Sequence, residues 1–118
     1  MVTNKLSKEQ IQIITDLVID NGLIYTEAQH TLLIGDSLFI LRLMVINDEL
    51  NKLYLTSLQD NISIEYVLNK LDSLLERLDT YRRSYYNDNN KFKMFAYRFM
   101  NSFFDKTSET FYELMNTI

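Results

Sequence analysis

One glutamate and one histidine have the spacing of a metal-binding pair. Glu27 and His30 are three residues apart, which in a helix places both side chains on one face. Carboxylate-bridged dimetal bundles use this Glu-x-x-His spacing, but they need two such pairs and two further inward-facing glutamates. His30 is the single histidine of the chain, and a place in the first turn of a helix explains Glu27 without a metal. The sequence therefore predicts no metal site and no cofactor.

Nucleophilic and phosphate-transfer chemistry have little support in the sequence. The chain has no cysteine, so a histidine-dependent nucleophile would have to use His30. Its two glycines, Gly22 and Gly35, stand alone and cannot form a glycine-rich phosphate loop. One row of acids follows an expected helix: Glu65, Asp72, Glu76 and Asp79. This row is most simply the solvated face of the helix, so we predict neither an enzyme nor a small-molecule substrate.

Half of the twelve basic residues lie between residues 77 and 98. This segment has six basic and two acidic residues, hence a charge of +4, whereas the whole chain has a net charge of −4. Tyrosines and phenylalanines are interleaved with the basic residues, and such mixtures hold phosphates and stack on bases. The predicted binding residues are Arg77, Arg82, Arg83, Tyr85, Tyr86, Lys91, Lys93 and Arg98.

Two kinds of partner fit this basic and aromatic segment. A nucleic acid would use the charges and the rings together, whereas an acidic protein surface would use the charges. The acidic character of the whole chain is unusual for a dedicated nucleic-acid-binding protein. Tyr81 and Tyr85 also continue the apolar spacing of a helix, so they fit core positions whose rim is covered by Arg and Lys. A protein partner is therefore favoured, with nucleic acid as the alternative.

A second candidate surface is the apolar run of residues 38–46, LFILRLMVI. Nine residues are too few to cross a membrane, which takes about 20. An unpaired buried guanidinium is very costly, so Arg42 is expected to reach the surface or to pair with a carboxylate across an interface. We predict an interface for a protein partner or a second copy of the chain at Arg42, Leu38, Leu41 and Val45. Arg42→Glu is then expected to weaken association and leave the fold intact.

The strongest helical pattern in the chain lies at residues 63–86. Its apolar positions alternate in steps of three and four: Ile64, Val67, Leu71, Leu74, Leu78, Tyr81 and Tyr85. This spacing predicts a long amphipathic helix around which the others pack. Ser63 is the expected N-cap, and the polar residues 87–90 are the expected loop to an antiparallel neighbour.

Capping patterns predict where the first helices begin and end. Ser7 and Gln10 form a capping-box pair, and Gly22 is expected to end the first helix in a left-handed conformation. Thr26 and Gln29 repeat the capping-box spacing, so a second helical region is expected from Thr26.

Two further breaks are expected along the chain. Gly35 is predicted to interrupt or bend the second region, with a long helix at residues 37–57 after it. Residues 105–107 are predicted to interrupt the last region, with Thr107 capping a short final helix.

The absence of proline and the scarcity of glycine favour an all-α fold, because sheets need turns built from these residues. We predict one domain over residues 1–118, a compact antiparallel four- to five-helix bundle with a long central helix near residues 64–86. No basic start precedes an apolar N-terminal run, so a cytoplasmic protein without a signal peptide is expected. The Ile-, Asn-, Lys- and Tyr-rich composition is typical of AT-rich bacterial or phage genes. The expected function is a non-enzymatic adaptor, inhibitor or regulator that binds a larger protein.

Overall fold

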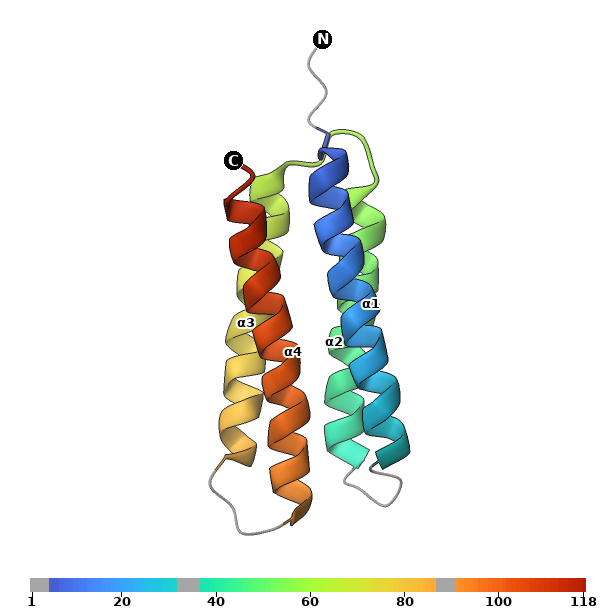
Figure 1. Ribbon diagram of the computed structural model, residues 1–118, viewed down its shortest axis with the longest axis vertical. Helices are drawn as coiled ribbons and strands as arrows, with labels where there is room; N and C mark the ends of the chain where they lie inside the picture. The colour runs from blue at the N-terminus through green and yellow to red at the C-terminus, as the bar shows by residue number, and fades with distance from the viewer. Residues whose placement is uncertain (1–4, 32–36, 87–90) are drawn as a thin grey trace.

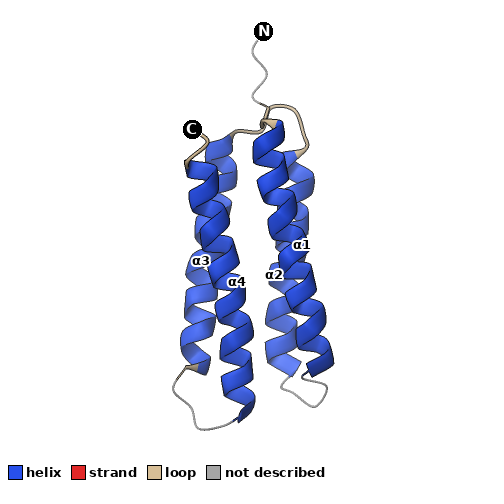
Figure 2. Cartoon of the chain, viewed as in Figure 1, coloured by secondary structure: helices blue, strands red, loops and turns tan. Residues whose placement is uncertain are grey.

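The computed structural model describes residues 5–31, 37–86 and 91–118. Over these ranges the chain forms four helices and no strand (Figure 2). The helices are α1 (Lys8–Thr31), α2 (Ser37–Ser57), α3 (Ile64–Tyr85) and α4 (Lys91–Met115). Successive helices run in opposite directions and lie side by side in an elongated bundle (Figure 1). The predicted all-α antiparallel bundle is confirmed, with four helices in the described part of the chain.

The four helices form a ring in chain order, which α1 and α4 close by packing against each other. α3 and α4 have the most extensive contact, whereas α2 and α3 have much the smallest contact of the four neighbouring pairs. In Figure 1, α1 and α4 lie in front and α2 and α3 lie behind them. α3 is therefore one side of the ring. Each helix contributes one apolar stripe, so the core lies between the helices.

The core follows the apolar stripes that the sequence indicates. On α3, five of the predicted positions are buried: Val67, Leu71, Leu74, Leu78 and Tyr85. The largest completely buried side chains come from all four helices and include Ile14, Leu17, Phe39, Leu43, Leu71, Leu78, Phe103 and Leu114. Burial of apolar surface on this scale is the main stabilising contribution to such a bundle.

Local capping fixes two helix starts as predicted. The backbone N–H of Ser7 donates to Gln10 Oε1 at 2.9 Å, and the N–H of Gln10 donates to Ser7 Oγ at 3.1 Å. This reciprocal pair satisfies two backbone donors that have no partner inside the helix. Ser63 Oγ accepts from the Tyr66 N–H at 3.1 Å, which confirms Ser63 as the N-cap of α3. The predicted helix at residues 37–57 coincides with α2.

The prediction that Gly22 ends the first helix is wrong. α1 continues to Thr31, and the hydroxyl of Thr26 donates to the Gly22 carbonyl at 2.9 Å as a mid-helix bond, not as a cap. Glu27 consequently lies near the end of α1 and not in a first turn. Asn21 and Ala28 are completely buried, so one inner stripe extends through this region. Packing of that stripe outweighs the cost of about 1 kcal/mol of a glycine inside a helix.

The predicted interruption at residues 105–107 is also wrong. α4 runs without a break through these residues, and Thr107 is completely buried inside the helix. Met100, Phe103, Thr107 and Leu114 form one buried stripe, which keeps the helix continuous across the polar sequence. The predictions for Gly35 and for the loop at residues 87–90 lie outside the described residues.

Candidate functional site

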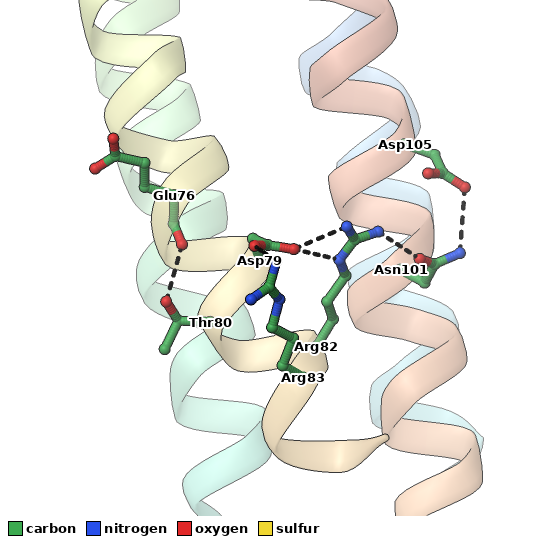
Figure 3. Close-up of polar contacts among 7 residues, drawn as sticks. All are labelled: Glu76, Asp79, Thr80, Arg82, Arg83, Asn101 and Asp105. Carbon is green, nitrogen blue, oxygen red and sulfur yellow. Dashed lines mark hydrogen bonds and ion pairs between the residues drawn. The ribbon is translucent and has the colours of Figure 1, made fainter. Parts of the chain in front are cut away.

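Arg82 and Arg83, two of the predicted binding residues, share one acidic partner on α3. Asp79 Oδ1 lies 2.8 Å from Arg82 Nη2, and Asp79 Oδ2 lies 2.9 Å from Arg83 Nη2. Figure 3 shows both guanidinium groups converging on this carboxylate, and also the Thr80 hydroxyl donating to the Glu76 carbonyl one turn earlier. Part of the positive charge predicted for this segment is therefore neutralised within the protein.

Arg82 also connects α3 to α4. Its Nη1 donates to Asn101 Oδ1 at 3.0 Å, and Asn101 Nδ2 donates to Asp105 Oδ2 at 3.2 Å (Figure 3). The Arg82 guanidinium lies 3.7 Å from the centroid of the Phe104 ring, a stacking geometry that arginine favours. The side chain of Arg82 is 26% exposed, whereas that of Arg83 is 77% exposed. Arg82 is thus a structural link, and Arg83 is accessible to a partner.

Arg82→Ala is expected to lower the free energy of unfolding by about 1–2 kcal/mol, because it removes charged hydrogen bonds and a ring contact. Arg83→Ala is the matched control, since it removes the same charge and shares Asp79, and it should change the free energy by less than about 0.5 kcal/mol. Urea denaturation followed by circular dichroism measures both values. Equal losses in the two variants would show that Arg82 does not link the helices.

The other predicted residues of the 77–98 segment are divided between core and surface. Tyr85 is buried, and its ring lies 5.5 Å from that of Phe39. Tyr86 is 62% exposed and its ring lies 5.3 Å from that of Tyr97. Arg98 is exposed. The side chains of Lys91 and Lys93 lie outside the described part of the structure.

Arg42 makes its contacts with α3 of the same chain. Its Nη1 donates to the Tyr85 hydroxyl at 3.0 Å, and its guanidinium lies 4.7 Å from the centroid of the Tyr81 ring. Arg42 is partly buried, so its aliphatic part is covered, while its guanidinium group contacts the side chains of Tyr81 and Tyr85. These contacts accommodate the charge of Arg42 within the apolar run of residues 38–46.

Arg77 forms a second bridge between α2 and α3, through an ion pair and hydrogen bond with Glu49. The sequence grouped Arg77 with the arginines that follow it, but the structure turns it toward α2. The seam between α2 and α3 is thus spanned by long polar side chains, in keeping with its small helix-to-helix contact.

Beside these bridges the structure has a cleft of about 370 Å³ between α2 and α3. Its lining, which defines the α2/α3 cleft, consists of Glu49, Lys52, Leu53, Thr56, Tyr66, Lys70, Ser73, Leu74 and Arg77. Leu53 and Leu74 are 6% and 4% exposed and form an apolar floor. The lining has three basic residues and one acid, whereas the whole chain is acidic. This site was not predicted from the sequence.

The apolar surface predicted on α2 is exposed in the structure. The exposed fractions are 47% for Leu38, 49% for Leu41, 45% for Met44 and 40% for Val45. These residues occupy the first half of α2, on the side away from its buried stripe of Phe39, Leu43 and Ile46. Met44 was not among the predicted interface residues, although its position beside Val45 was a signal for it.

Glu27 and His30 are both exposed, and no cluster of three or more acidic or histidine side chains suited to a metal ion occurs in the described ranges. No described helix combines the length and apolar character needed to cross a membrane. Comparison of the chain with protein-family models, with curated proteins and with solved structures finds no match.

Proposed function

We propose that this protein is a non-enzymatic interaction module, an adaptor, inhibitor or regulator that binds a larger protein. The observation that carries the proposal is the group of exposed apolar side chains on α2, namely Leu41, Met44 and Val45. Exposed apolar residues that stand alone are ordinary, but neighbouring ones on one helix mark a surface that a partner covers. α2 buries a separate stripe in the core, so these side chains are not needed to hold the bundle together.

Leu41→Glu is expected to weaken binding to a protein partner by about tenfold or more while leaving stability nearly unchanged, because it places a charge in an apolar contact. Affinity capture from a nuclease-treated lysate of the source cells measures partner binding, and denaturation measures stability. Leu23→Glu, the same substitution at a side chain of α1 that is 66% exposed, is the matched control. Undiminished capture by Leu41→Glu would contradict the proposal.

A second copy of the chain is the other protein that this surface could bind. Size-exclusion chromatography with light scattering distinguishes the two cases, since a homodimer changes mass with protein concentration and a monomer does not. Loss of the dimer in Leu41→Glu would assign the α2 surface to self-association.

Arg42→Glu is less suited to this test than the sequence suggested. Arg42 bonds to Tyr85 and stacks on Tyr81, so its replacement is expected to affect the α2/α3 contact as well as any binding. Leu41→Glu separates the two effects, because Leu41 is half-exposed and lies outside the buried core cluster.

The second candidate function is a regulator that contacts nucleic acid, favoured by the exposed Arg83, Tyr86 and Arg98. Titration of labelled single- and double-stranded oligonucleotides, monitored by fluorescence anisotropy, tests it at low and physiological salt. Binding that falls steeply with salt and is lost in Arg83→Glu/Arg98→Glu would support this function. Arg82 is left unchanged in that variant because it holds α3 to α4.

A further inference from the structure

The α2/α3 cleft is the place where the helix ring is least closed. Three of the four neighbouring helix pairs pack closely, whereas α2 and α3 are joined by bridges such as Arg77–Glu49 and Arg42–Tyr85. The cleft lies beside the Arg77–Glu49 bridge, and its lining extends from Glu49 to Thr56 on α2 and from Tyr66 to Arg77 on α3. The lining therefore covers about two turns of α2 and about three turns of α3, a length that suits an elongated ligand.

The charges that line the α2/α3 cleft are mostly positive. Glu49 is the acid of the lining, and it is already paired with Arg77. Lys52 pairs with Asp48 at 3.1 Å, but its side chain is 74% exposed, so this ion pair contributes little stability. Lys52 can therefore exchange Asp48 for a carboxylate of a partner at little cost. Lys70 has no ion pair with any described residue, and its ammonium lies 5.5 Å from the Tyr66 ring centroid. The cleft thus presents cations to an incoming negative group.

The floor of the cleft has a different chemistry from its rim. Leu53 and Leu74 lie at the bottom, Tyr66, which is 41% exposed, lines the wall, and Thr56 and Ser73 supply hydroxyl groups. An amphipathic helix that lies in a groove places its apolar side chains on such a floor and its polar side chains against the rim. The rim here is basic, so the complementary helix is acidic.

We propose that the α2/α3 cleft binds an acidic amphipathic helix of the protein partner, with apolar side chains on Leu53 and Leu74 and carboxylates toward Lys52 and Lys70. This inference rests on the proposed function and names the partner's chemistry. The open cleft does not surround a small anion. Nucleic acid is disfavoured by the apolar floor and by Glu49, and a membrane surface by the concave shape of the cleft.

The test uses a fluorescent synthetic helix with leucines on one face and glutamates beside them, and a matched peptide with glutamine in place of each glutamate. The full-length protein should bind the glutamate peptide about tenfold more tightly than the glutamine peptide in fluorescence anisotropy. In ¹H–¹⁵N spectra, the amide shifts should be concentrated on α2 and α3, with Thr56 and Ser73 among them.

Lys70→Glu should weaken binding of the glutamate peptide by about tenfold, because an attractive charge becomes repulsive. Lys8→Glu is the matched control: the same charge change at an exposed residue of α1, away from the cleft. Circular dichroism confirms that both variants fold.

Several outcomes would overturn the inference. They are equal binding of the two peptides, amide shifts confined to other helices, or retained affinity in Lys70→Glu. Binding of single-stranded DNA or of anionic lipid vesicles with the same Lys70 dependence, without peptide binding, would assign the cleft to a different polyanion. If capture of the partner is lost in Leu41→Glu but unchanged in Lys70→Glu, binding of the partner in the α2/α3 cleft is refuted, whereas the proposed function is still supported.

Discussion

Leu43→Ala is expected to lower the free energy of unfolding by about 2–5 kcal/mol, the range for removing a fully buried leucine. Leu43 is completely buried in the stripe that α2 contributes to the core, together with Phe39 and Ile46. Its truncation loses transfer energy and leaves a cavity that four packed helices cannot easily close. The total free energy of unfolding of a domain of this size is typically about 5–15 kcal/mol, so the loss should be visible in thermal and urea denaturation.

Leu41→Ala provides a matched control on the same helix, two residues away. Leu41 is 49% exposed, so the identical substitution should change the free energy of unfolding by less than about 1 kcal/mol. The comparison separates burial from helix propensity, because both variants replace leucine by alanine inside α2. Similar losses at the two positions would mean that the inner face of α2 is assigned wrongly.

The second large effect is a gain in stability from removing buried polar atoms. Both side-chain polar atoms of Asn21 and the hydroxyl of Thr107 are buried without a hydrogen-bond partner. Their neighbours in sequence, Asp20 and Lys106, form an ion pair at 3.6 Å, so the two residues lie at the same level of the α1/α4 contact. A buried polar group without a partner costs about 1–3 kcal/mol.

Asn21→Leu and Thr107→Val keep the branching and the number of heavy atoms while removing these polar groups. We expect a gain of about 1–3 kcal/mol for Asn21→Leu and about 1 kcal/mol for Thr107→Val, measured by urea denaturation. Asn69→Leu, at an exposed position of α3, corrects for the difference in helix propensity. A loss of stability in Thr107→Val would show that its hydroxyl has a partner, such as a buried water.

The elements that were predicted correctly are those with strong local patterns. Ser63 and the three-four spacing after it define α3 without any tertiary information. At Gly22 and Thr107 the local signals failed, because burial of α1 and α4 along their whole length outweighs a glycine or a capping residue. Tertiary packing joins residues that are far apart in the chain, so a pattern of a few neighbouring residues does not reveal how much it stabilises a helix.

The candidate cleft was missed for a different reason. Sequence proximity grouped Arg77 with Arg82 and Arg83, but α3 turns these side chains toward different neighbours. The cleft combines Lys52 of α2 with Lys70 and Arg77 of α3, two segments that are separated by a connection. The seven-residue spacing of Lys70 and Arg77 places them on one flank of α3, but only the fold reveals that α2 faces this flank.

The α1/α4 contact has a consequence for the order of folding. α1 with α2, and α3 with α4, are neighbours in the chain and form antiparallel hairpins from contacts close in sequence, which fold fast. The α1/α4 contact instead joins distant residues, such as Asp20 and Lys106, which form an ion pair at 3.6 Å. Just beyond the end of α4, Thr117 also bonds to Gln10 at 3.0 Å across 107 positions. Because closing so long a loop costs more entropy, we expect two hairpins to form first and then to dock through α1 and α4. Asn21→Leu and Thr107→Val stabilise the α1/α4 contact, which forms when the two hairpins dock. These substitutions should therefore lower the unfolding rate more than they raise the rate at which either hairpin forms.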